Sequence, residues 1–218
     1  GRRSEGIYTP PSLQGTVEYP SYAGGSDWGG LAFDPVRQLA FVNTNNIAAL
    51  VRLIPRDQVT AENRGSFPGL SEQRGTPYMM SREVLTSFLG LPCSPPPWGR
   101  LAAIDMTNGT IKWQVPLGTT RDKAPIWLTY GMPNMGGAIA TASGLVFIAA
   151  ATDNYLRAFD AETGKELWRG RLPAGGQATP MTYQLADGRQ YVVIAAGGHG
   201  SLGTTIGDSL VAFALPRQ

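Results

Sequence analysis

Four short segments of this sequence carry polar or aromatic side chains of the kind that bind ligands. They contain Asp27 with Trp28, Asn134, Asp153 with Asn154, and Gly198 with His199. Three of the four adjoin glycines, which let a backbone approach a ligand closely, and loops with such residues commonly line pockets. The imidazole N–H of His199 is a donor suited to orienting a polar ligand.

Each of these residues also has a purely structural interpretation. Trp28 could pack between neighbouring structural units, and Asn134 could only cap a turn. Asp153 and Asn154 have the composition of an ordinary hairpin turn, and His199, the single histidine of the chain, could face solvent in its glycine-rich loop. The residue types alone leave both interpretations open.

Residues 144–168 are the stretch that positions two of these candidates. An apolar, β-branched run over 145–150 predicts a buried strand, and Asp153 and Asn154 interrupt it. A second strand is expected over 155–160. The segment 160–165 then predicts a turn, because Asp160 can bond its own backbone and Gly164 can take a positive φ. A third strand ends on Trp168.

The same pattern occurs earlier in the chain. Residues 103–113 share Ala, Asp, Gly and Trp columns with residues 158–168, and Trp113 precedes Trp168 by 55 residues. Weaker copies flank the pair, so that four alanines follow one another at steps of 54, 55 and 54 residues. These alanines are Ala49, Ala103, Ala158 and Ala212.

A period near 50 residues made of strands and turns predicts the blades of a β-propeller. The expected fold class is therefore all-β, with four-stranded antiparallel blades and about four of them in this chain. Trp113 and Trp168 are expected to pack between neighbouring blades. Asp105 and Asp160 are expected to be turn residues and not acids.

The rest of the chain is less regular. Residues 16–19 predict a short strand, and residues 31–35, 39–43 and 47–53 predict strands of one meander. Residues 56–98 are polar and rich in Gly and Pro, and we expect a long loop excursion there, with one short helix over 81–89 capped by Ser81. A loop of that length is usually functional or disordered.

Composition narrows the class of protein. The 218 residues, treated as one domain over 1–218, are 42% hydrophobic and only 16% charged, and the 28 glycines and 17 prolines favour many turns. The net charge of +2, without a basic face, indicates no nucleic acid. The single Cys93 excludes an intrachain disulfide, and its role is open. No apolar run is long enough to span a membrane. The opening Gly1, without Met, predicts a piece of a longer protein.

The repeat Ala-x-Asp-x-x-x-Gly-x-x-x-Trp resembles the tryptophan-docking motif of quinoproteins, eight-bladed propellers that bind pyrroloquinoline quinone (PQQ). Further motifs are similar to the C-terminal part of the membrane-bound glucose, quinate and polyol dehydrogenases. They are Leu-Pro-Cys at 91–93 with Pro-Pro-Trp-Gly at 96–99, residues 129–137, Gly-Gly-Gln-Ala-Thr-Pro-Met at 175–181, and Gly-Gly-His-Gly-Ser at 197–201.

This resemblance implies a chemistry. A sugar, quinate or polyol hydroxyl is oxidised at the periplasmic face of the bacterial inner membrane, with PQQ as cofactor and ubiquinone as electron acceptor. Calcium or magnesium polarises the quinone, and an Asp acts as base. The family's metal ligands and base lie in earlier blades that match nothing here. The chain is therefore expected to supply part of the PQQ pocket and to be inactive alone.

The resemblance also favours the functional interpretation of the candidate residues. It implies that Asp153, with Asn154, lies close to the quinone and that His199 orients PQQ or the sugar. Asp27, Trp28, Asn134 and Gly198 are expected to contact the cofactor because their loops border glycines. A non-catalytic propeller scaffold for protein assembly in the bacterial envelope is the rival interpretation. Because an incomplete propeller exposes apolar blade faces, we expect self-association.

Overall fold

The computed structural model describes residues 1–124 and 127–216. In that part of the chain the regular structure is strands together with three short 3-10 turns, η1 (Arg56–Gln58), η2 (Arg64–Ser66) and η3 (Gly200–Leu202). The all-β fold class is confirmed. The chain divides into two compact units: one holds residues 1–25 and 46–95, and the other holds residues 26–45 and 96–218.

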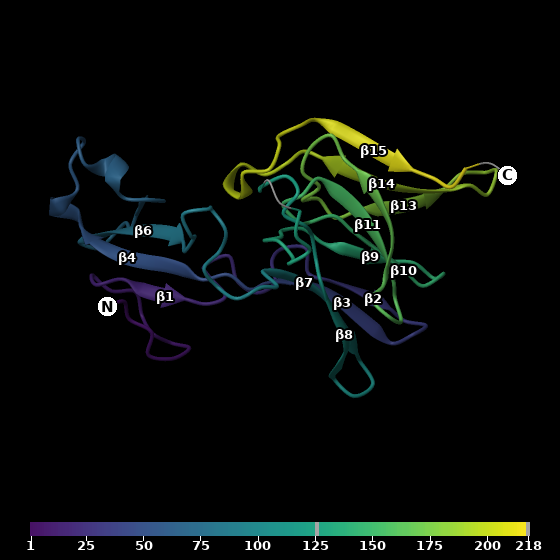
Figure 1. Cartoon of the computed structure of the whole chain (residues 1–218), viewed down its shortest axis with the longest axis horizontal. Coiled ribbons are helices and arrows are strands. Elements are labelled where there is room, and N and C mark those ends of the chain that lie inside the picture. The colour runs from purple at the N-terminus through teal and green to yellow at the C-terminus, as the bar shows by residue number, and fades with distance from the viewer. Residues whose placement is uncertain (125–126, 217–218) are drawn as a thin grey trace. The chain divides into compact units, whose positions relative to one another are not determined.

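The larger unit contains three antiparallel sheets (Figure 1), and the strands of the second and third sheets are consecutive in the chain. The first sheet has the order β2 (Leu31–Asp34), β3 (Leu39–Asn45), β7 (Gly99–Asp105), β8 (Thr110–Pro116). The second is β9 (Ala138–Ala140), β10 (Leu145–Ile148), β11 (Tyr155–Asp160), β12 (Glu166–Arg171), and the third is β13 (Met181–Gln184), β14 (Gln190–Ala196), β15 (Ser209–Phe213). Meanders of this kind are propeller blades, as the repeat predicts.

The two strong copies of the repeat occupy equivalent places in the first two sheets. Ala103 on β7 pairs with Trp113 on β8, and Ala158 on β11 pairs with Trp168 on β12. Both pairs are followed by a shift in register at the next residue. The repeat therefore specifies both the pairing of the two strands and the position of the register shift between them.

The turn that follows each third strand is also repeated. The carboxylate of Asp105 accepts the backbone N–H of Thr107, and that of Asp160 accepts the N–H groups of Glu162 and Thr163. These are turn contacts, as expected for both aspartates.

Trp113 docks on the turn of the neighbouring sheet. Its indole Nε1 donates to the carbonyl oxygen of Ala161 at 2.9 Å. Gly164, at φ +70°, lies so close that a Cβ there would stand 2.6 Å from the indole ring. Trp168 packs edge-on against Phe213 of the third sheet, with ring centroids 5.0 Å apart. The predicted packing of both tryptophans between blades is confirmed.

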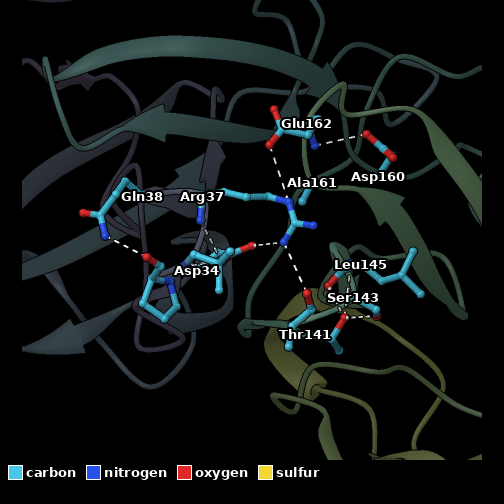
Figure 2. A network of polar contacts seen from close by, with 12 residues as sticks. Asp34, Arg37, Gln38, Thr141, Ser143, Leu145, Asp160, Ala161 and Glu162 are labelled. Carbon is cyan, nitrogen blue, oxygen red and sulfur yellow. Dashed lines mark hydrogen bonds and ion pairs between the residues drawn. The ribbon is translucent and has the colours of Figure 1, made fainter.

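A polar clamp supports the same junction (Figure 2). Arg37, in the turn between β2 and β3, donates from Nη1 to Asp34 Oδ2 at 2.9 Å, and its Nε lies 3.5 Å from Oε1 of Glu162. Lys112 on β8 pairs with the other carboxylate oxygen of Glu162. The clamp joins two sheets through residues more than 100 positions apart, since Arg37 also reaches the carbonyl oxygen of Ala142 at 3.4 Å.

The smaller unit holds the fourth sheet, in the order β1 (Thr16–Glu18), β4 (Ala49–Pro55), β6 (Tyr78–Val84), β5 (Ser71–Glu72). Residues 46–98 are thus an insertion between β3 and β7, whose ends pair at Asn45 and Gly99. The strand at 16–19 is confirmed. The assignment of residues 47–53 to the meander of 31–43 is wrong, because β4 pairs with β1 and β6. Ala49 is consequently not equivalent to the other three alanines.

The helix expected over residues 81–89 is also wrong. Tyr78–Val84 forms strand β6, paired along its length with β4. The first residues alternate between half-buried and buried, as a period of two requires, and pairing with β4 satisfies the backbone. The hydroxyl of Ser81 donates to the carbonyl oxygen of Pro68 at 2.7 Å and caps no helix.

The topology of the larger unit gathers the candidate residues at one end of its sheets. In a meander, the segment before the first strand and the link between the second and third strands leave at the same end. Trp28 and Asn134 lie in segments before a first strand. Asn154 and His199 lie in links between second and third strands. One apolar core cluster of this unit includes Leu156, Leu172 and Ile194, which come from the second and third sheets and the segment after β12.

Candidate functional site

An open hollow of about 280 Å³ lies at this end of the larger unit. Its lining residues are Trp28, Gln177, Ala178, Ala195, Gly197, Gly198 and His199. The rings of Trp28 and His199 meet across it, with centroids 5.5 Å apart and planes inclined by 41°. Two candidates separated by more than 170 residues in sequence therefore form one surface.

The loop that carries Trp28 packs closely on the segment before β9. A Cβ on Gly29 would stand 2.1 Å from the carbonyl oxygen of Gly136, so only glycine fits there. Asp27 accepts the backbone N–H of Trp28 on its carboxylate at 2.7 Å. Trp28 as a whole residue is 61% exposed, which makes it different from the two docking tryptophans.

The loop of His199 is equally constrained. Gly198 has φ +72°, and a Cβ there would lie 2.1 Å from the carbonyl oxygen of Thr205. The Nδ1 atom of His199 is buried, and within the described residues it has no hydrogen-bond partner. A buried polar atom without a partner is uncommon in folded proteins and calls for a ligand, a water or a rearrangement.

Asn134 is buried inside a network of amide groups. Its Oδ1 accepts from Asn43 Nδ2 at 2.6 Å, and its Nδ2 donates to the carbonyl oxygen of Thr44 at 3.1 Å. Its backbone N–H and carbonyl oxygen both bond the side-chain amide of Asn45. The side chain thus ties β3 to the segment before β9, and its contact with a cofactor stays a prediction.

Asp153 forms a buried ion pair. Its two oxygens bind the two Nη atoms of Arg157 on β11, and both side chains are at most 1% exposed. Oδ2 also accepts the backbone N–H and the hydroxyl of Thr119, at 2.7 and 2.8 Å. Arg157 reaches Glu166 with its Nε at 3.3 Å. Asp153 therefore holds protein groups with both carboxylate oxygens.

Asn154, the next residue, is held differently. Its backbone N–H donates to Asp122 at 2.9 Å, and its Nδ2 donates to the hydroxyl of Thr205 at 3.3 Å. Its Oδ1 is buried with no partner among the residues described. The side-chain hydrogen bonds from Arg171 hold the pKa of the Asp122 carboxyl below its usual value, against the opposing effect of burial. The backbone of Asn154 is thus anchored by a charged carboxylate, while its side-chain oxygen keeps no partner in the described chain.

The structure brings Trp28, Gly198 and His199 together at the hollow and places Asn154 on the loop that supports it. Asp27 stands beside Trp28, whereas Asn134 and Asp153 are occupied by protein partners. Gln177 lines the hollow and was missed by sequence reasoning. Its place in the motif at 175–181 was the signal that could have pointed to it.

Within residues 1–124 and 127–216, no group of three or more His, Cys, Asp or Glu side chains is placed to hold a metal ion. The same residues contain no helix that is long and apolar enough to cross a membrane.

The sheets have the architecture of propeller blades, and the hollow is a candidate site at the end where their loops lie. The family model for the glucose/ethanol/alcohol dehydrogenase β-propeller domain, which is named for PQQ, matches residues 1–192. The chain belongs to this family of PQQ-dependent dehydrogenase propellers. The resemblance and the cofactor that it implied are confirmed at the level of the family.

Several curated proteins are similar over nearly the whole chain. The quinoprotein glucose dehydrogenase of Escherichia coli (strain K12) is 45% identical, with 98% of this chain and 28% of that protein covered. The probable quinate dehydrogenase (quinone) of Xanthomonas campestris pv. juglandis is 44% identical, covering 98% and 29%. The glycerol dehydrogenase large subunit of Gluconobacter oxydans (strain 621H) is 42% identical, covering 97% and 31%. The chain spans less than a third of the length of these relatives.

Solved structures agree on the fold. The quinohemoprotein alcohol dehydrogenase ADHIIG of Pseudomonas putida HK5 is 26% identical, with a TM-score of 0.57 over 84% of this chain and 23% of that chain. A europium-containing methanol dehydrogenase has a TM-score of 0.63 at 24% identity, over 92% of this chain and 35% of that chain. At that identity, the similarity to the methanol dehydrogenase shows a shared fold and nothing more.

The residues at the hollow fit one side of a PQQ site. PQQ is planar and rich in acceptors, so an exposed aromatic face, a free imidazole and close-approaching glycines suit it. Trp28, His199 and Gly198 supply these three properties. None of the residues that line the hollow is a lysine or an arginine. The cationic side chains that would pair with the three carboxylates of PQQ must therefore come from other residues.

Proposed function

We propose that this chain forms one side of the PQQ pocket of a quinoprotein dehydrogenase that oxidises a hydroxyl of a sugar, quinate or another polyol. The observation that carries the proposal is the pairing of Trp28 and His199 across the hollow. The buried Nδ1 atom of His199 has no hydrogen-bond partner among the described residues, so it is available to a ligand. The names of the similar proteins support the substrate class, since they specify glucose, quinate and glycerol.

Roles for the chain's own residues follow from their geometry. The exposed face of Trp28 offers a flat surface for a planar ligand. The ring of His199 orients an oxygen of that ligand through an N–H donor, and Gly198 admits the ligand close to the backbone. Bound PQQ supplies the hydride acceptor. The catalytic base and the ligands of the calcium or magnesium ion are assigned to residues outside this chain.

Asn154 and Asp153 take different parts in this proposal. Asn154 retains a buried acceptor without a partner in the described chain, so it is the better candidate for a contact with the cofactor. Asp153 is engaged by Arg157 and Thr119 and acts by holding the β10–β11 link in place. Asn134 acts in the same indirect way through its contacts with β3.

The proposal also covers the electron acceptor of the whole protein and the location of the whole protein in the cell. The name of the quinate relative specifies a quinone, which supports ubiquinone as the acceptor. A quinone of that kind lies in a membrane, so we place the whole protein at the periplasmic face of the inner membrane. We also propose that the isolated 218-residue chain self-associates, because Leu31, Met181 and Leu210 are more than half exposed on first or last strands. A single monomeric species in sedimentation velocity would contradict this last point.

The test uses the whole gene product that carries this chain, depleted of cofactor and reconstituted with PQQ and calcium or magnesium. We expect reduction of an artificial acceptor with at least one of glucose, quinate, shikimate and glycerol. His199→Ala and Trp28→Leu should each raise the dissociation constant for PQQ by about tenfold or more. Trp127→Leu is the matched control, since Trp127 is also half exposed but packs on Arg121 and Arg169 instead.

Two outcomes would overturn the proposal. The absence of any PQQ-dependent oxidation and of PQQ binding by the whole protein would favour the scaffold interpretation. Equal PQQ affinity in His199→Ala, Trp28→Leu and Trp127→Leu would retain an enzyme but move the cofactor away from this hollow.

A further inference from the structure

A buried relay of hydrogen bonds joins the loop of His199 to the end of β10. The backbone N–H of His199 donates to Thr204 Oγ1 at 2.7 Å, and Thr204 Oγ1 lies 3.0 Å from Gln177 Oε1. Gln177 Nε2 then donates to the carbonyl oxygens of Ala150 and Ala151, at 3.3 and 3.0 Å. Three segments that are far apart in the sequence are linked by two side chains.

The direction of each bond in the relay is fixed by its neighbours. The amide nitrogen of Gln177 must face the two carbonyl oxygens, so its Oε1 can only be an acceptor. The Thr204 hydroxyl therefore donates its one proton to Gln177 Oε1 and accepts the backbone N–H of His199 on its oxygen. The alternative contact of Thr204 Oγ1 with the carbonyl oxygen of His199 is longer, at 3.4 Å.

The relay is enclosed. Gln177 is 5% exposed and Thr204 is 6% exposed. A Cβ on Gly175 would stand 2.3 Å from Gln177 Oε1 and 2.6 Å from Thr204 Oγ1, so glycine is required to make room. Gly175 also bonds the loop directly, since its N–H donates to Thr205 and its carbonyl oxygen accepts the N–H of Gly198.

A satisfied polar network in a protein interior fixes one geometry, because each unpaired member would be costly. The Nδ1 atom of His199 has no hydrogen-bond partner in the described residues, and the ring contacts Trp28, so the backbone of its loop contributes strongly to where the imidazole points. That backbone is fixed at His199 by the Thr204 hydroxyl.

We propose that Thr204 and Gln177 are positioning residues that set the orientation of His199 toward PQQ. This inference rests on the proposed function for the use of the imidazole, but the relay itself can be tested without the cofactor. Gln177 lines the hollow and also belongs to the relay. Thr204 does not line the hollow, so it acts only through its bonds to His199 and Gln177.

The first test compares Thr204→Val with Thr204→Ser in the whole PQQ-reconstituted protein. Valine keeps the shape of threonine but removes the hydroxyl, which leaves the His199 N–H and Gln177 Oε1 unpaired. Serine keeps the hydroxyl. We expect the dissociation constant for PQQ to rise about tenfold in Thr204→Val and to return to within about twofold of wild type in Thr204→Ser. The turnover number at saturating PQQ should change much less than the affinity.

Thr182→Val is the matched control. The Thr182 hydroxyl also donates a hydrogen bond of 2.8 Å, to the carbonyl oxygen of Tyr191, but it lies on β13 and is exposed. The PQQ affinity of the Thr182→Val variant should equal that of wild type. Equal affinities in Thr204→Val, Thr204→Ser and wild type would overturn the inference.

The second test needs no cofactor. His199 is the single histidine of the 218 residues, so one imidazole signal in the NMR spectrum of the chain reports on it alone. Thr204→Val should shift and broaden that signal, and Thr204→Ser should restore it. An unchanged signal in a folded Thr204→Val would contradict the relay. If wild type binds no PQQ yet the signal responds as expected, the relay stands and only the proposed function fails.

A second variant covers the case in which Thr204→Val does not fold. In Gln177→Glu the carboxyl still accepts from Thr204, but when ionised it cannot donate to Ala150 or Ala151. The His199 signal of this variant should approach that of wild type at acidic pH, where the carboxyl is protonated, and depart from it toward neutral pH. A difference from wild type that does not depend on pH would count against the relay.

Discussion

The indole Nε1 of Trp113 lies 2.9 Å from the carbonyl oxygen of Ala161, a residue 48 positions later in the turn of the neighbouring sheet. This one bond joins two blades. The substitution Trp113→Phe would keep an aromatic ring over Gly164 but remove the donor. We expect the free energy of unfolding to fall by about 1 kcal/mol, measured by urea denaturation.

The control for this change is Trp127→Phe, because Trp127 makes cation–π contacts with Arg121 and Arg169 instead of docking on a turn. A loss of stability in Trp127→Phe as large as that in Trp113→Phe would argue that the bond to Ala161 contributes nothing specific.

Gly164 and Gly109 offer a matched pair for the docking contact. Both have positive φ, +70° and +75°, at equivalent places in the two copies of the repeat. A Cβ on Gly109 meets nothing within 4 Å, whereas a Cβ on Gly164 meets the ring of Trp113 at 2.6 Å. Gly109→Ala should cost about 1 kcal/mol for backbone strain alone. Gly164→Ala should cost a further ~1–3 kcal/mol, because the tryptophan must move.

Thermal or urea unfolding of both alanine variants measures the difference. The double variant that combines Gly164→Ala with Trp113→Ala should lose the extra cost, since no ring remains to clash. Equal stabilities of Gly109→Ala and Gly164→Ala would show that the indole is not held on the turn.

The ion pair of Asp153 with Arg157 predicts a large effect on stability. Asp153→Asn would leave the guanidinium of Arg157 buried beside a neutral amide, with the partly exposed Glu166 as its other partner. Breaking a buried pair in this way costs about 3–5 kcal/mol. The double variant Asp153→Asn with Arg157→Met should recover part of that loss, and the measurement is urea unfolding of all three proteins.

This prediction also separates structure from cofactor binding. If Asp153→Asn is as stable as wild type but binds PQQ more weakly, the aspartate acts on the cofactor directly and not through the fold.

The lowered pKa of Asp122 predicts a dependence of stability on pH. Its folded pKa lies below the unfolded value of about 4, chiefly because Arg171 bonds the charged form. The unfolded chain therefore binds the proton more readily, so the contribution to stability is present above about pH 4 and is lost as the pH falls through the folded pKa.

Asp122→Asn removes that contribution. We expect the variant to be less stable than wild type at pH 7 by under about 1 kcal/mol, since the pair is partly exposed, and the difference should shrink below pH 4. Asp57→Asn, in an exposed turn, is the control. A difference between Asp122→Asn and wild type that stays constant from pH 7 to pH 3 would refute the assignment.

The sequence alone determined the local architecture. The Ala, Asp, Gly and Trp columns of the repeat specify a strand, a turn and a strand within eleven residues, and the turns at Asp105 and Asp160 formed as predicted. Contacts between near neighbours decide such units, so a pattern can specify them. The candidate loops around Trp28 and His199 were found for the same reason.

Only the tertiary structure decided which strands pair and which polar groups meet. β4 has the apolar pattern of the strands before it, yet it pairs with β1 and β6 because residues 46–98 form an insertion. Asp153 meets Thr119, and Gln177 meets Thr204, because separate loops pack together. The partner of a polar side chain depends on which segments the sheets bring together. The spacing of residues along the sequence does not contain that information.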